Sequence, residues 1–126
     1  METIHLDTHV IVWLFQKDLA KFTKQSLKLI NNNELVVSPM VVMELKFLNE
    51  IGRLNYKPME IIAELTKTIA LKVSDEKFAT TAYESLDLSW TRDPFDRLIV
   101  ASASTQKAKL ISKDRNILEH YEFAVW

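Results

Sequence analysis

The chain has 126 residues, of which 48% are hydrophobic and 26% charged, so we expect one globular domain spanning residues 1–126. It contains no cysteine, which excludes both a disulfide framework and a thiolate metal site. The formal net charge of −1 excludes a global basic field, so any attraction to nucleic acid must come from a local group of lysines and arginines.

The first fifteen residues, METIHLDTHVIVWLF, are apolar but carry Glu2 and Asp7 and lack the basic start of a signal peptide. No stretch approaches the roughly 18 to 20 uninterrupted apolar residues of a membrane span. We therefore expect a cytoplasmic protein that does not enter a membrane.

Short β-rich runs alternate with segments of helical spacing along the chain. The predicted strands are Thr3–Leu6, Leu35–Ser38, Ile69–Val73, Ala108–Ser112 and Glu122–Trp126. The predicted helices are Val10–Phe15, Leu19–Ile30, Val41–Ile51, Pro58–Lys67, Glu76–Leu86 and Pro94–Gln106. Because parallel strands need long crossover connections, this order predicts an α/β fold of three layers, α/β/α, with a central parallel sheet of four to five strands.

Two aspartates lie where predicted strands end. Asp7 follows the first strand directly, and Asp114 follows the fourth after one lysine. Ligands of such sheets bind beyond the carboxyl ends of the strands, so both carboxylates are expected at the ligand-binding edge.

Two further acids occupy apolar helix faces. Glu44 lies on the same apolar helix face as Val41 and Leu45. Asp96 precedes Ile99 by three residues, a spacing that places both on one face of a helix. A buried carboxylate is costly unless it is paired, hydrogen-bonded or bound to a metal, so something must compensate these two.

Local roles explain each acid separately. Asp93 can cap a helix that begins at Pro94, with Asp96 in its first turn, and Asp7 and Asp114 can cap the helices that follow them. Glu44 can lie at the edge of the core.

One chemical role explains Asp7, Glu44, Asp96 and Asp114 together, as carboxylates converging on a single pocket. Oxygen ligands without cysteine or a paired histidine favour Mg²⁺ or Mn²⁺ over zinc. Such a site suits phosphodiester hydrolysis.

Four segments in this order, HLDTHVIVWL, VSPMVVMELKFLNEIGRL, RDPFDRLIVASA and LISKD, resemble the PIN-domain family, and in particular the VapC-type toxins of VapBC toxin–antitoxin pairs. The similarity covers nearly the whole chain. It implies a Mg²⁺- or Mn²⁺-dependent endoribonuclease whose acidic quartet falls on Asp7, Glu44, Asp96 and Asp114. The three aspartates would be metal ligands, whereas Glu44 is either a ligand or the group that orients the attacking water.

The resemblance also suggests accessory residues. Asp93 is similar to an extra acid of this subgroup, and Thr8 and Ser112 are the small hydroxyl residues beside the acids. Relatives often have threonine where Ser112 stands. Among the flanking basic residues, we favour Arg97 for phosphate contact because it adjoins Asp96.

The same resemblance implies three partners: an RNA substrate, a second copy of the chain in a homodimer, and a cognate antitoxin that blocks the pocket. Two other functions remain possible from the sequence. One is a PIN-like module that binds RNA or protein without catalysis. The other is a phosphotransferase that phosphorylates Asp7, although the chain lacks the second aspartate two residues later that one phosphatase class requires.

Overall fold

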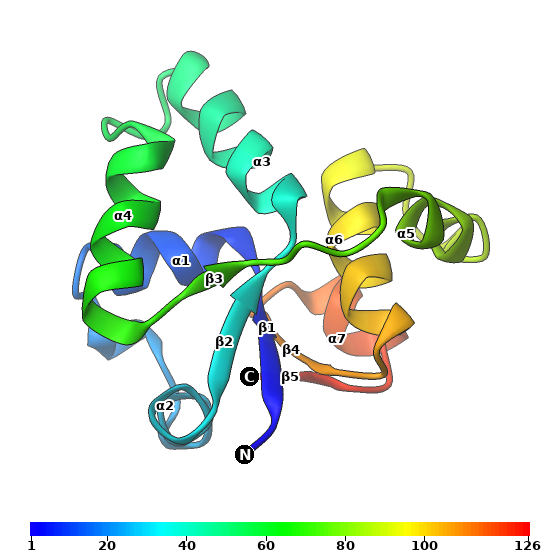
Figure 1. Ribbon diagram of the computed structural model, residues 1–126, viewed down its shortest axis with the longest axis horizontal. Helices are drawn as coiled ribbons and strands as arrows, with labels where there is room; N and C mark the ends of the chain where they lie inside the picture. The colour runs from blue at the N-terminus through cyan, green and yellow to red at the C-terminus, as the bar shows by residue number, and fades with distance from the viewer.

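The structure, a computed structural model, describes all 126 residues and has a five-stranded sheet at its centre (Figure 1). The strands are β1 (Thr3–Leu6), β2 (Glu34–Val37), β3 (Lys72–Val73), β4 (Lys109–Ile111) and β5 (Ala124–Val125). They are ordered β3-β2-β1-β4-β5 and every neighbouring pair is parallel, which confirms the predicted sheet.

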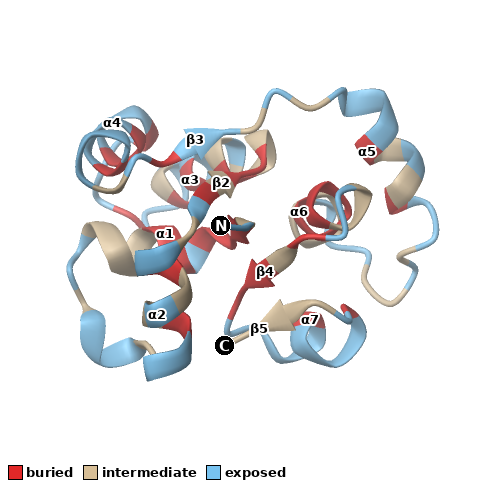
Figure 2. Ribbon diagram, turned by 60° about the horizontal axis from the view of Figure 1, so that its bottom comes forward, coloured by how far each residue is buried: buried red, intermediate tan, exposed pale blue.

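Seven α-helices and one 3-10 turn connect the strands. They are α1 (Thr8–Phe15), the turn η1 (Leu19–Lys21), α2 (Lys24–Asn32), α3 (Pro39–Glu50), α4 (Pro58–Ile69), α5 (Phe78–Ser85), α6 (Pro94–Thr105) and α7 (Arg115–His120). Figure 2 shows α1, α2 and α4 on one side of the sheet and α5, α6 and α7 on the other, so the α/β/α layering is also confirmed.

Most predicted elements differ from the structure by one or two residues at their ends, as in the fifth strand, which is Ala124–Val125, and two are wrong by more. The predicted helix Leu19–Ile30 is divided because Thr23 caps a new helix, accepting a hydrogen bond from the Ser26 N–H while the Ser26 side chain accepts one from the Thr23 N–H. The predicted strand Ile69–Val73 retains only its last two residues, because α4 runs through Ile69 and Ala70 ends it in the left-handed conformation (φ 55°).

The strand order creates a switch point between β1 and β4. From β1 the chain proceeds to β2 and β3 on one side, then returns to β4 and β5 on the other. In the register of this pair Leu6 lies opposite Ile111, so the residues that follow, Asp7 and Ser112, are neighbours at the carboxyl edge. Open α/β sheets bind ligands at such a crevice.

The core lies on both faces of this sheet and fixes its geometry. Ile4 and Leu6 of β1 and Leu110 and Ile111 of β4 are fully buried and belong to one apolar cluster. The acids that follow these strands are therefore mounted on the most rigid part of the molecule.

Candidate active site

A cavity of about 430 Å³ opens at the carboxyl edge of β1 and β4. Its walls are formed by Asp7, His9, Trp13, Glu44, Asp93, Asp96, Lys113 and Asp114. The fold thus brings all four acids of the predicted quartet, and the extra acid Asp93, around one space.

Three of these acids are N-caps. Asp7 caps α1 by accepting the Thr8 N–H (2.8 Å), Asp93 caps α6, and Asp114 caps α7 by accepting the Ile117 N–H (3.1 Å). The capping roles predicted from the sequence are therefore confirmed. The same three side chains also line the cavity, so capping does not prevent a second role there. Because each helix begins at the edge of the sheet, capping is what aims these side chains at the cavity.

Asp7 is the most enclosed of the acids, with only 6% of its surface exposed. Its Oδ2 accepts a hydrogen bond from the Ser112 hydroxyl (2.7 Å), and the Ser112 oxygen in turn accepts the Asp114 N–H (3.0 Å). Burial raises the pKa of Asp7, opposed by the hydroxyl of Ser112 and the N–H of Thr8. Ser112 thus links the side chain of Asp7, which follows β1, to the backbone of Asp114, which follows β4.

Glu44 approaches from the second turn of α3. Its Oε1 accepts a short hydrogen bond from the Thr8 hydroxyl (2.5 Å), which ties α3 to the start of α1. Burial raises the pKa of Glu44, and the charges of Asp7 and Asp93 raise it further. Thr8 and Ser112, predicted as accessory hydroxyls, therefore each hold one carboxylate.

Asp96 is different, because its carboxylate accepts no hydrogen bond from the protein. Partial burial, followed by repulsion from Asp7, Asp93, Asp114 and Glu44, raises the pKa of Asp96 to about 7. A carboxyl whose pKa is raised both by burial and by four like charges lies in a site with an excess of negative charge.

The carboxylates are spread around the cavity wall. As the side chains lie, no three acidic or histidine residues are close enough together to hold a metal ion. The spreading agrees with the mutual repulsion that raises the pKa of Asp96, since separated charges repel less.

The donor set nevertheless fits a hard divalent cation. Every acid offers oxygen, cysteine is absent, and Mg²⁺ is usually bound through only one or two carboxylates while it keeps several waters. A divalent cation in this cavity would bind one or two of the carboxylates directly or through water and reduce the repulsion among the rest.

Arg97, favoured from the sequence for phosphate contact, has another set of partners. Its guanidinium donates to the carbonyls of Ser85 (2.8 Å), Leu86 (3.1 Å) and Thr91 (3.4 Å). It does not line the cavity. Arg97 instead holds the loop between α5 and α6, and through it the start of the helix that carries Asp96.

Three cavity residues were not predicted as part of the site: His9, Trp13 and Lys113. His9 and Trp13 both belong to α1. Their spacing contained the missing signal, because residues two and six positions after the helix cap Asp7 lie on the same face of the helix.

A parallel α/β sheet with an acidic cavity at its switch point defines a class of site suited to binding a cation and a phosphate ester. A family model for the PIN domain matches residues 4–123. Ribonuclease VapC22 from Mycobacterium tuberculosis (strain ATCC 25618 / H37Rv) is 30% identical over 125 residues, covering 95% of this chain and 93% of the relative.

The fold is shared with solved structures at lower identity. VapBC2 from Rickettsia felis, bound to a DNA fragment from its promoter, matches with a TM-score of 0.72 and 16% identity over 98% of this chain and 97% of that chain. DNA-bound VapBC from Salmonella typhimurium matches with a TM-score of 0.63 and 17% identity over 98% and 96%. This chain belongs to the PIN-domain family, in its VapC-type branch.

None of the helices combines the length and the apolar character needed to cross a lipid bilayer.

Proposed function

We propose that this protein is an endoribonuclease that depends on Mg²⁺ or Mn²⁺, and that it is the toxin of a toxin–antitoxin pair. The observation that carries the proposal is the convergence of Asp7, Glu44, Asp93, Asp96 and Asp114 on one cavity at the switch point of the sheet. The mycobacterial relative is a ribonuclease by name, which supports the same chemistry.

In this proposal Asp7, Asp96 and Asp114 hold the cation, directly or through water. When bound, the metal supplies positive charge beside the scissile phosphate and makes water more acidic. The chain's own contribution is positioning: the Ser112 hydroxyl fixes one oxygen of Asp7, and the Thr8 hydroxyl fixes Oε1 of Glu44. Glu44 then serves as a further ligand or orients the attacking water.

The role of Asp93 follows from its two surroundings. Its Oδ1 accepts the N–H groups of Phe95 (2.9 Å) and Asp96 (3.2 Å), so it caps α6. It also lines the cavity and adds to the negative charge there. We assign it to positioning Asp96 and to strengthening cation attraction.

A cognate antitoxin is the second part of the proposal, supported by VapBC complexes among the solved structures. The surface of α3 and α4 exposes apolar side chains that a partner would cover: Met43 is 60% exposed, Phe47 45% and Met59 65%. Patches of this kind mark protein interfaces. We also propose that the toxin is a homodimer.

The test uses the purified full chain with structured cellular RNAs in Mg²⁺, in Mn²⁺ and in EDTA. We expect cleavage with either metal, none in EDTA, and a loss in Asp7→Asn exceeding the roughly 10- to 100-fold that loss of an outer-shell partner costs. Asp87→Asn is the matched control, because Asp87 is an exposed aspartate away from the cavity.

Intact RNA in every lane would overturn the nuclease and favour a module that only binds RNA or protein. Cleavage that survives both EDTA and Asp7→Asn would place the activity elsewhere. The antitoxin part has its own assay: co-purified partner should suppress cleavage by the wild type, and a partner that leaves cleavage unchanged contradicts it.

A further inference from the structure

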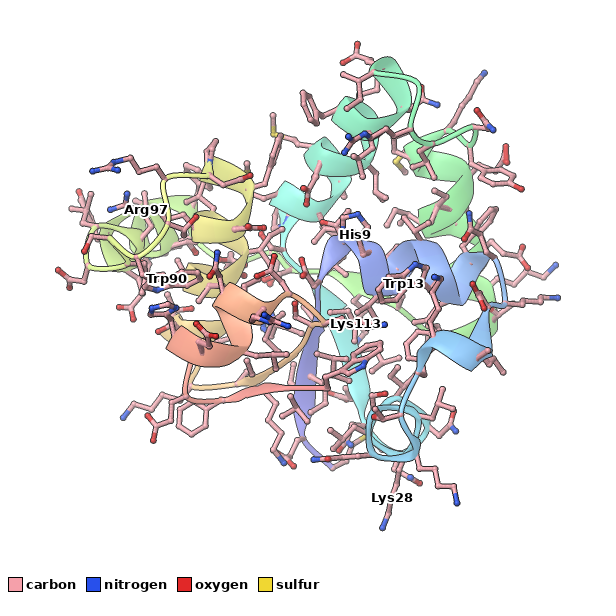
Figure 3. All side chains as sticks on the ribbon, turned by 180° about the vertical axis from the view of Figure 1, so that it is seen from behind. His9, Trp13, Lys28, Trp90, Arg97 and Lys113 are labelled. Carbon is pink, nitrogen blue, oxygen red and sulfur yellow. The ribbon has the colours of Figure 1, made fainter.

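The acidic cavity has a second wall that the proposed hydrolysis does not use. It consists of His9, Trp13 and Lys113, and Trp13 is the single hydrophobic residue among the lining residues. Figure 3 shows these three side chains near one another, apart from Trp90 and Arg97. An aromatic and cationic wall beside five carboxylates calls for a ligand with both a flat ring and negative charge.

The orientation of Trp13 is fixed by its aromatic neighbours. The Phe22 ring lies 6.2 Å away at 90° and the Trp126 ring 5.7 Å away at 63°, while His9, one turn earlier on α1, lies 6.1 Å away at 44°. These contacts hold the indole without any ring stacking parallel on it. Trp13 remains only partly buried.

Trp90 provides the contrast. Its ring lies parallel to that of His120, with an interplanar angle of 3° and a centroid separation of 4.9 Å. One face of Trp90 is therefore already stacked, and Trp90 does not line the cavity. Of the three tryptophans, all partly buried, only Trp13 lines the cavity.

Two lysines surround this indole. The Nζ of Lys21 lies over the Trp13 ring, 5.4 Å from its centre, and the Nζ of Lys113 lies over the rings of Trp13 and Trp126, 5.9 Å from each centre. A base that stacks on Trp13 therefore displaces an ammonium group from the ring toward the neighbouring phosphate. Both lysines are exposed. The single ion pair of the protein joins Lys109 to Glu2, so neither ammonium group is committed to a carboxylate.

We propose that Trp13 is a stacking platform for an unpaired nucleobase of the RNA substrate, with Lys21 and Lys113 contacting the phosphates on either side of that nucleotide. This inference rests on the proposed function and names the part of the RNA that the site recognises. Aromatic side chains flanked by cations bind single-stranded RNA, whereas bases inside a duplex keep both faces stacked on their neighbours. The substrate class is therefore RNA that is unpaired at this nucleotide.

Stacking on Trp13 also helps to overcome the repulsion between the acidic cavity and the phosphates of RNA. The carboxylates repel the phosphate backbone, and the chain has no net positive charge to offset that repulsion. Attraction from a neutral base and two nearby ammonium groups holds the RNA beside the acids.

The experiment compares two probes of equal charge, a tetranucleotide of uridine and the abasic tetramer with the same ribose-phosphate backbone. Binding is measured in EDTA with the Asp7→Asn protein, so that no cleavage intervenes. We expect the uridine probe to bind on the order of tenfold more tightly than the abasic probe, the effect of stacking one base on an aromatic ring. Equal affinity for the two probes overturns the proposal.

Substitutions assign the effect to Trp13. Trp13→Leu should remove the preference for the uridine probe, Trp13→Phe should retain most of it, and the matched control Trp90→Leu should leave it unchanged. Lys21→Gln should lower the slope of log affinity against log salt by about one for both probes. A preference for uridine that persists in Trp13→Leu contradicts the assignment.

Folding is checked by thermal unfolding, since Trp13 also packs against Phe22 and Trp126. If Trp13→Leu does not fold, a protein with Trp90→Phe and Trp126→Phe retains Trp13 as its sole tryptophan. Its fluorescence should be quenched by the uridine probe and not by the abasic probe; equal quenching by both overturns the stacking.

The two proposals fail in different ways. If wild-type protein cleaves RNA in Mn²⁺ but Trp13→Leu shows the same uridine preference, the platform is wrong and the nuclease stands. If no RNA is cleaved yet the preference depends on Trp13, the nuclease is wrong and the RNA-binding platform stands.

Discussion

The carboxylates of the acidic cavity and the carboxylate of Glu76 lie in the same fold but in opposite surroundings. Glu76 precedes α5, and its two oxygens accept hydrogen bonds from the hydroxyls of Ser102 on α6 and Thr81 on α5. Asp96 in the cavity accepts none, and partial burial, together with repulsion from four other acids, raises its pKa to about 7. One acid is matched by donors, and the other is surrounded by charges of its own sign.

The surroundings of Glu76 belong to a polar cluster where β1 meets α5 and α6. His5 is 1% exposed, and its Nε2 lies 3.3 Å from Oε1 of Gln106 while its Nδ1 has no partner. Burial lowers the pKa of His5, which favours the neutral ring. Both groups use polar contacts to join elements, but only the cavity contains a carboxylate, that of Asp96, without a hydrogen-bond donor.

The largest effect is expected from the Ser112 hydroxyl, which holds the most buried carboxylate of the cavity. Ser112→Ala removes the donor to Oδ2 of Asp7, and we expect cleavage to fall about 10- to 100-fold, as when an outer-shell partner of a metal ligand is lost. Ser112→Thr keeps the hydroxyl and should retain most of the activity. Measuring kcat/KM against Mn²⁺ concentration checks this, and an unaffected alanine variant would remove Ser112 from the site.

The next effect should appear in stability and not in cleavage. Glu76→Ala leaves the buried hydroxyls of Ser102 and Thr81 without their acceptor, which we expect to cost about 1 to 3 kcal/mol. Urea unfolding measures the loss, and cleavage is assayed at a temperature where the variant is folded. A variant with full stability, or one that loses cleavage while folded, would break the contrast between the two groups of acids.

The smallest effect concerns Asp96 and has a defined pH dependence. Because the folded pKa of about 7 is raised above the ordinary value of 3.8, ionised Asp96 destabilises the fold, and this penalty grows as pH rises from about 4 to about 7. In EDTA, Asp96→Asn should therefore raise the melting temperature above pH 7. Because Asp96 is partly exposed, solvent screens the penalty, and the expected gain is a few degrees, about 2 to 6 °C.

At a pH below 4 the same substitution should gain nothing, since Asp96 is then protonated in both states. Asp87→Asn supplies the control, because Asp87 is exposed and outside the cavity. A gain that does not depend on pH would mean that repulsion among the cavity acids is not its source.

Most of the fold could be predicted from the sequence because local signals, such as residue spacing and proline positions, mark its helices and strands. The first strand was predicted residue for residue, and Pro58 and Pro94 marked the starts of α4 and α6. The errors fell where local signals competed. Apolar spacing predicted one continuous helix across Thr23, although this residue caps a new helix. β-Branched residues led to a third strand that was predicted too long and overlapped the end of α4.

The sequence alone determined which acids stand at strand ends and on apolar helix faces, because those positions follow from periods of two and 3.6 residues. Only the tertiary structure decided what surrounds them. The switch point between β1 and β4 places Asp7 beside Ser112 across 105 residues of chain, and α3 brings Glu44 to Thr8. Contacts across such separations depend on strand order and register, which no local pattern encodes. For the same reason the sequence assigned Arg97 to phosphate contact and did not place Trp13 at the site. The folded chain shows the carbonyls to which Arg97 donates and the cavity that Trp13 lines.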